Sequence, residues 1–342
     1  MDLQLVWFGL IGLLWAGYLV LEGFDFGVGA LLPRLGRGTD AVDSEKRRRV
    51  MLTAIGPHWD GNEVWLLTAG GATFAAFPEW YATMFSAFYL PLLLVLVALI
   101  VRNMGLEYRH KRDDAQWRRR WDTAIIAGSV LAPFLIGVAL TNVVRGLPID
   151  ADLEFTGSLF TLLNPLALLG GATVLALSLT HGAVFVALKT TGTIREDARR
   201  LATPLGLVTA GLAVVTLGWL GLLSGSVWSW STTVVAAAAL LGGLGANAVG
   251  REGWAFAGTA VTGAATVATY FLALHPDVMP TTSADGRSLT IANASSSPMT
   301  LEIMTWAAVV FTPVVLLYTG YTYYAFRKRL GTQHIPDAVA VK

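Results

Sequence analysis

VMLTAIGPHWDGNEVWLLTAGGATFAA, residues 50–76, is an apolar stretch long enough to cross a bilayer, yet polar residues lie close together inside it. They are His58, Asp60, Asn62 and Glu63. A carboxylate at the centre of a membrane helix costs about 3 kcal/mol even on the scale derived from helix insertion. The stretch therefore indicates either a segment that is not in a membrane or polar groups that serve a function there.

The composition of the whole chain places it in a membrane. Of its 342 residues, 54% are hydrophobic and only 14% are charged, whereas soluble domains carry about a quarter charged residues. Apolar runs of membrane-spanning length recur along the sequence, and we predict an all-α polytopic membrane protein that forms a single integral membrane domain over 1–342. The predicted spans number nine and cover about 4–31, 50–76, 80–102, 121–144, 158–188, 203–224, 230–248, 254–274 and 301–326.

Lysine and arginine are distributed unevenly between the two sets of loops. One set, together with the C-terminal tail, holds 22 of the 24 basic residues, and the other set holds only Arg145 and Arg287. Basic loops face the cytoplasm, so we predict the N-terminus outside and the C-terminus inside. Because topology accounts for the basic residues and the net charge is only +1, we predict no nucleic-acid partner.

A second group of acids lies near the end of the first span, in YLVLEGFDFGVGALLP at residues 18–33. Glu22 and Asp25 are three residues apart and therefore share one face of a helix. Asp25 lies about 12 Å from the end of its span, and Asp60 lies about 15 Å into the next one. The sequence therefore predicts that Asp25 and Asp60 meet at similar depth on adjacent antiparallel helices.

The second span is also predicted to be interrupted. Pro57 removes one hydrogen bond within the helix and can free carbonyl groups that line a wet cavity. Beyond it, Asp60 and Glu63 share one face, while His58 and Asn62 share another. Carboxyl groups in such a place can take up and release protons. The predicted proton pathway consists of Glu22, Asp25, His58, Asp60 and Glu63, and we predict no catalytic or metal-binding residue.

Histidine decides whether this chain binds haem. Only His58 and His181 fall within the predicted spans, the first in the middle of its span and the second nearer the cytoplasmic end. A bis-ligated b-type haem needs two axial ligands on facing helices. There is also no cysteine, which excludes iron–sulfur clusters and c-type haem attachment in this chain. We therefore expect no cofactor bound by this chain.

Seven segments, in order along the chain, carry a family resemblance: GFDFGVG (23–29), GPHWDGNEVWLLTAGGATFAAFP (56–78), LTNVVRGLPID (140–150), HGAVFVALKTTG (181–192), DVMPTT (277–282), ASSSPMTLEIMTW (294–306) and TPVVLLYTGYTYYAFR (312–327). Together they resemble subunit II of the cytochrome bd quinol oxidases. The resemblance implies nine helices, arranged as two four-helix bundles plus one peripheral helix. It also implies that Asp25 and Asp60 are linked to the uptake of protons.

For function, the resemblance implies a multi-pass protein of the bacterial cell membrane that pairs with a haem-bearing subunit I. That partner holds two b-type haems and one haem d, and the complex oxidises quinol and reduces O2 to water with protons from the cytoplasm. The resemblance leaves open whether a small accessory subunit attaches and whether a lipid or a structural quinone binds this chain. Two alternatives to an oxidase subunit with a proton inlet remain: a proton-coupled secondary transporter and a purely structural scaffold subunit.

Overall fold

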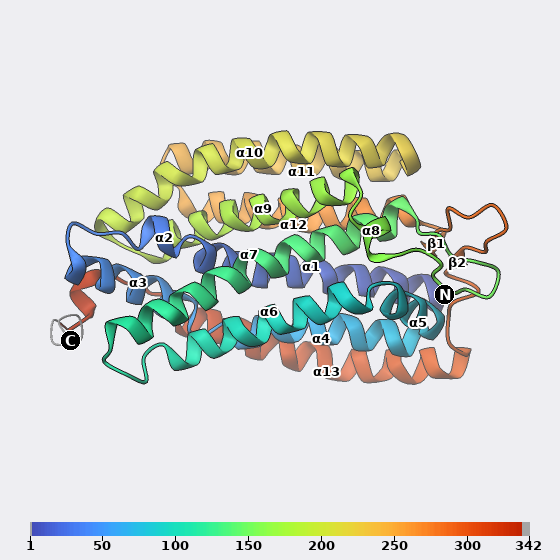
Figure 1. The fold of residues 1–342 in the computed structure, drawn as a ribbon, viewed down its shortest axis with the longest axis horizontal. Helices are drawn as coiled ribbons and strands as arrows, with labels where there is room; N and C mark the ends of the chain where they lie inside the picture. Colours follow the sequence, from blue (N-terminus) through green and yellow to red (C-terminus); the bar gives the residue numbers. More distant parts are fainter. Residues whose placement is uncertain (1, 337–342) are drawn as a thin grey trace.

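The computed structural model describes residues 2–336, which are almost entirely helical (Figure 1). This confirms the predicted all-α class. The long helices are α1 (Leu3–Ala30), α3 (Ala41–Ile55), α4 (Trp59–Ala76), α5 (Pro78–Ala87), α6 (Tyr89–Tyr108), α7 (Ala115–Arg145), α9 (Pro165–Lys189), α10 (Gly192–Ser224), α11 (Val227–Ala248), α12 (Glu252–Leu274) and α13 (Pro298–Ala325). The short elements are α2 (Leu32–Leu35), α8 (Leu159–Leu162), the strands β1 (Asp277–Met279) and β2 (Leu289–Thr290), and the 3-10 helix η1 (Thr332–His334).

The long helices lie side by side in two groups, and α13 runs along one edge (Figure 1). One group contains α1, α4, α6 and α7, and the other contains α9, α10, α11 and α12. Among the described residues, eight helices are long and apolar enough to cross a membrane: α1, α6, α7, α9, α10, α11, α12 and α13. The molecule is therefore a multi-pass membrane protein by the length and composition of its helices.

The stretch predicted as one span over 50–76 is two helices, so that prediction is wrong as a continuous span. The first, α3, ends at Ile55, and α4 begins at Trp59. Pro57 has no backbone N–H to continue the helical hydrogen bonds, and the N–H of His58 donates instead to the carbonyl of Ile55 at 2.9 Å. The predicted interruption at Pro57 is confirmed, and the polar α3 is not a membrane-spanning helix.

The stretch predicted as the third span, 80–102, also has different limits. It divides at Phe88 into α5 and α6, because Pro91 near the start of α6 cannot donate a hydrogen bond back to the preceding turn. Helix α6 then continues to Tyr108. Arg102, which the charge count assigned to a loop, therefore lies inside a helix and is completely buried.

The two groups of helices are held together where α1 crosses α9. A Cβ atom added at Gly27 of α1 would lie 2.0 Å from the carbonyl oxygen of Ser178, and one added at Gly182 of α9 would lie 2.5 Å from the Cα of Gly27. Only glycine permits two helix backbones to approach this closely. The contact fixes α1, which carries two of the predicted site residues, against the second group.

At one end of the molecule, α3 is joined to α6 and α7 by charged side chains. The two terminal nitrogens of Arg109 donate to the two carboxylate oxygens of Glu45 at 2.9 and 2.8 Å, and its Nε donates to Asp122 at 2.5 Å. Burial raises the pKa of the Glu45 carboxyl, but the hydrogen bonds from Arg109 outweigh burial and hold that pKa below its ordinary value of 4.5. Folding is therefore linked to the charge of Glu45.

Glu45→Gln is expected to lower the melting temperature of the purified protein, by an amount equivalent to about 2 kcal/mol at neutral pH. Because the pKa of Glu45 is lower in the folded state, its contribution is present above pH 4.5 and is lost as the pH falls through the folded-state pKa. The difference in melting temperature between the variant and the wild type should therefore become smaller below pH 4.5. Glu196→Gln is a matched control, because Glu196 is exposed and lies 4.0 Å from Arg200. A difference that stays constant with pH would contradict the linkage.

Candidate functional site

Helices α1, α4, α6 and α13 bring a group of buried polar side chains together. On α1, Tyr18, Glu22 and Asp25 follow one another at intervals of four and three residues, so they lie on one face of the helix. All three are completely buried. Helix α4 begins at Trp59, after the break at Pro57; His58, the residue directly before the helix, and Asn62, in its first turn, are both buried. The break between α3 and α4 therefore lies beside the polar face of α1, and these two polar residues are buried there.

Glu22 forms a buried ion pair with Arg102 of α6. The Nη1 of Arg102 donates to the Oε1 of Glu22 at 2.5 Å, and neither side chain is exposed. The guanidinium also lies over the ring of Phe26, 4.8 Å from its centre. A pair of this kind tolerates the loss of one partner poorly, because the remaining charge is left buried without compensation.

Asp25 is joined to α4 and α13 by a chain of hydrogen bonds. The Nδ2 of Asn62 donates to the Oδ2 of Asp25 at 2.7 Å, and the hydroxyl of Tyr323 donates to the Oδ1 of Asn62 at 2.8 Å. The ring of Tyr323 stacks on His58, with 4.2 Å between the ring centres. Asn62 uses both ends of its amide, so it holds the carboxylate of Asp25 in one orientation.

The structure places the two other predicted acids differently. Glu63 is partly buried and accepts a hydrogen bond from the side chain of Asn103. Asp60, however, is exposed on the outer side of α4. The predicted meeting of Asp25 and Asp60 is therefore wrong for this chain by itself, since Asn62 faces Asp25 instead. Helical spacing shows which residues share a face, but it does not show which face turns inward.

Several polar atoms of this cluster have no hydrogen-bond partner in the described part of the chain. They are Oδ1 of Asp25, Oε2 of Glu22, the hydroxyl of Tyr18, Nε and Nη2 of Arg102, Nδ1 of His58 and Oδ1 of Asn103. Buried polar groups in folded proteins are nearly always satisfied, commonly by water. Their concentration around Glu22 and Asp25 is typical of a hydrated polar region between helices.

The two buried histidines within the predicted spans do not form a pair of free haem ligands, because His181 is fully engaged by other residues. His181 of α9 is buried, and both of its ring nitrogens are engaged, Nδ1 with the hydroxyl of Thr259 at 2.7 Å and Nε2 with the carbonyl of Val20 at 3.0 Å. Its ring also stacks on Phe256. Among the residues that the structure describes, no three histidine, cysteine or acidic side chains are grouped to hold a metal ion. His181 therefore serves as a link between α1, α9 and α12.

Sequence reasoning missed Arg102, Asn103 and Tyr323 as members of this group. Arg102 was counted with the basic loops, although the apolar residues beyond it, Met104 and Leu106, extend the helical pattern to Tyr108. A carboxyl within a span, such as that of Glu22, requires a partner. This requirement could have pointed to a basic residue in another helix, such as Arg102. Tyr323 lies in the segment 312–327, which carries part of the family resemblance, but the resemblance implies no role for this residue.

The fold and this cluster define a class of protein: a multi-pass helical membrane protein with buried, paired carboxylates between its helices. Residues 3–326 match the family described as cytochrome bd terminal oxidase subunit II. The chain belongs to this family.

Individual relatives agree with this assignment. Cytochrome bd ubiquinol oxidase subunit 2 of Bacillus subtilis is 39% identical over 95% of this chain and 96% of the relative. Cytochrome bd-I ubiquinol oxidase subunit 2 of Escherichia coli K12 is 36% identical over 97% of this chain and 96% of the relative. The fold is similar to that of a chain of the bd oxidase from Geobacillus thermodenitrificans, with a TM-score of 0.75, 18% identity and coverage of 95% and 97% of the two chains.

Proposed function

We propose that this chain is the second subunit of a quinol oxidase of the bacterial cell membrane, in a complex that oxidises quinol and reduces O2 to water. The single observation that carries this proposal is the family match over residues 3–326, and the names of the relatives from Bacillus subtilis and Escherichia coli support it. Membership of this family favours an oxidase subunit over a secondary transporter. The haems, two of b type and one of d type, belong to the partner subunit in this proposal, because His181 has no free ring nitrogen.

The surface around α13 supports a partner subunit. Of the 28 residues of α13, only Leu301 is buried, and large apolar side chains such as Phe311 and Leu317 are exposed by 66% and 75%. On the neighbouring α4, a Cβ added at Gly61 or Gly71 would meet nothing within 4 Å, which leaves room for the backbone of another helix. The partner is proposed to lie against this side, where Asp60 is exposed.

Within this complex, the polar cluster is proposed to deliver protons from the cytoplasm. Asp25 is the central residue, since Asn62 holds its Oδ2 while its Oδ1 has no partner among the described residues. A carboxyl that is held at one oxygen and open at the other can accept a proton there and pass it on. The Glu22–Arg102 ion pair places two opposite, fixed charges beside this route. Asp60 is proposed to continue the route toward the partner.

The proposed topology has the N-terminus outside and the C-terminus inside, with α4 as the ninth span. The distribution of basic residues supports this orientation. Helix α4 is 18 residues long and packs against α1, although its polar residues keep it out of the set of strongly apolar helices. Its polar groups face Asp25 and the proposed partner, which is where polar residues in spans are tolerated.

Purification of the chain with its membrane partners tests the proposed function. The complex is expected to contain a haem-bearing subunit and to consume O2 with quinol, because this chain offers no pair of free histidine ligands once His181 is engaged. After removal from the partner, this chain is expected to show no haem absorbance. Haem that stays bound in stoichiometric amount would contradict the assignment of the haems. Uptake of a solute by the chain alone would favour the transporter.

A further inference from the structure

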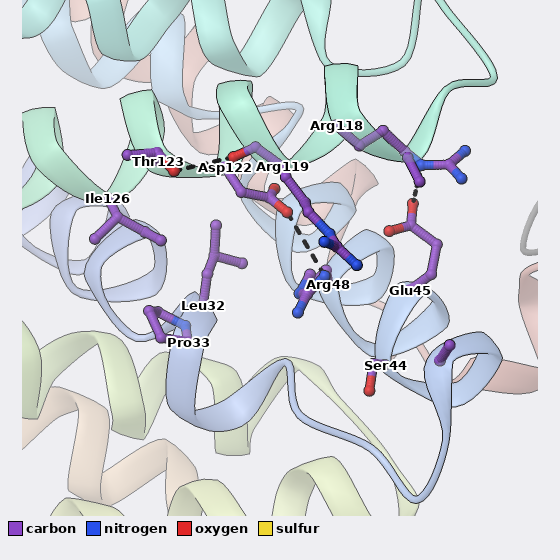
Figure 2. Close-up of a pocket in the computed structure, with 12 residues that line it drawn as sticks. Leu32, Pro33, Ser44, Glu45, Arg48, Arg118, Arg119, Asp122, Thr123 and Ile126 are labelled. Atoms are coloured by element: carbon purple, nitrogen blue, oxygen red, sulfur yellow. Dashed lines mark hydrogen bonds and ion pairs between the residues drawn. The ribbon is translucent and has the colours of Figure 1, made fainter.

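An open cavity of about 670 Å³ lies between α3 and α7 at the charged end of the molecule (Figure 2). No residue of the polar cluster lines it. Cavities of this size hold small ligands or parts of larger ones. Its two ends differ in chemistry. Leu32, Pro33 and Ile126 line one end, and charged side chains that include Arg48 and Arg119 line the other (Figure 2).

The two acidic side chains that line the cavity are paired with an arginine that lies outside it. Glu45 and Asp122 line it, but both accept close hydrogen bonds from Arg109, which does not line it. Arg48 forms an ion pair with Asp122 at 3.7 Å but no hydrogen bond, and it shares that carboxylate with Arg109 (Figure 2). The exposed Arg119 has no side-chain partner in the described part of the chain. Arg48 and Arg119 therefore leave positive charge available for a ligand from outside the chain.

The cavity lies where a phospholipid headgroup would be. The first turns of α7 are polar and the later ones apolar, so this helix passes from water into hydrocarbon between Arg119 and Ile126. These two residues are about 10 Å apart along the helix, compared with a headgroup layer about 5–7 Å thick. Trp117 and Trp121 pack against each other on the same part of α7, as aromatic residues do at the membrane interface.

We propose that this cavity binds an anionic glycerophospholipid, with its phosphate between Arg48 and Arg119 and the start of an acyl chain on Leu32, Pro33 and Ile126. Guanidinium groups bind phosphate oxygens in pairs, and basic pockets between membrane helices are suited to anionic headgroups. A water-soluble phosphate would leave the apolar end uncovered. A zwitterionic lipid would bring its own positive group close to the arginines. The proposal depends on the membrane position of α7 and not on the proton inlet.

The test compares the purified complex with its Arg48→Gln/Arg119→Gln variant by native mass spectrometry, after exchange into detergent with defined phosphatidylglycerol or phosphatidylcholine. The wild type is expected to retain phosphatidylglycerol in preference to phosphatidylcholine, and the variant to retain roughly tenfold less phosphatidylglycerol. Arg120→Gln is the matched control, because Arg120 is the next residue on α7, is exposed and does not line the cavity. It should retain phosphatidylglycerol as the wild type does.

Equal retention in the wild type and the double variant would overturn the proposal, as would an equal loss in Arg120→Gln. Displacement of the lipid by inorganic phosphate would show a site for soluble phosphate and would also overturn it. If the double variant does not assemble, Arg119→Gln alone provides the test, since this side chain is exposed; unchanged retention there counts against the proposal. Haem content and O2 consumption in the same preparations report separately on the proposed oxidase function.

Discussion

Arg102→Met is expected to destabilise the protein by about 3–5 kcal/mol, enough to lower the yield of the purified complex sharply. The variant leaves Glu22 completely buried without its ion-pair partner. The measurement is the yield of the complex and the melting temperature of what remains. Arg102→Lys should give an intermediate result, because lysine keeps the charge but not the planar group that lies over Phe26.

The double variant Glu22→Met/Arg102→Met tests whether the loss of stability in Arg102→Met comes from the unpaired charge of Glu22 or from the changed packing. Replacing both partners by apolar residues of similar volume removes the uncompensated charge, so the double variant should be more stable than Arg102→Met alone. If Arg102→Met is as stable as the wild type, Glu22 does not need its partner, and a structural role for the pair is wrong.

Asp25→Asn is expected to reduce quinol-dependent O2 consumption by roughly tenfold to a hundredfold while the haem content stays normal. Asparagine keeps the size of the side chain and can still accept a hydrogen bond from Asn62, but it cannot carry a proton. Asp25→Glu should retain part of the activity, because the longer carboxyl can still titrate. Oxygen consumption and haem absorbance are measured on the same preparation.

Asp60→Asn provides the comparison within the same proposed route. Because Asp60 is exposed on the side of α4 proposed for the partner, its substitution should leave the fold of this chain unchanged and lower turnover if protons pass between the subunits there. Normal turnover in Asp25→Asn would remove Asp25 from the route. A scaffold role would instead predict that both asparagine variants are tolerated and that bulky apolar substitutions disrupt assembly.

Sequence alone was sufficient for the features that depend on local chemistry. The helical class follows from composition, the break before α4 follows from Pro57, and the shared face of Glu22 and Asp25 follows from helical periodicity. His58 and Asn62 were correctly placed on one face, and both are buried. These features need only the geometry of a single helix.

The features that were missed depend on contacts between helices. Arg102 is the last residue of the predicted span 80–102 and was also counted with the basic loop that follows, and only its pairing with Glu22 on α1 explains its burial inside α6. Asp60 was expected inside because periodicity does not fix the rotation of a helix about its axis. The true neighbour of Asp25, Asn62, differs from Asp60 by two residues, which is about half a turn of the helix.

Glu22 is synthesised well before the arginine with which it pairs. The two residues are 80 positions apart, and ribosomes add about 5–20 residues each second, so α1 enters the membrane roughly 4–16 s before α6 delivers Arg102. Asn62 of α4, the partner of Asp25, follows about halfway through that interval, so Glu22 is the acid that waits longest for its partner. A nascent chain that ends before α6 therefore carries an unpaired acid in the bilayer, and this is the form that insertases and membrane proteases encounter first.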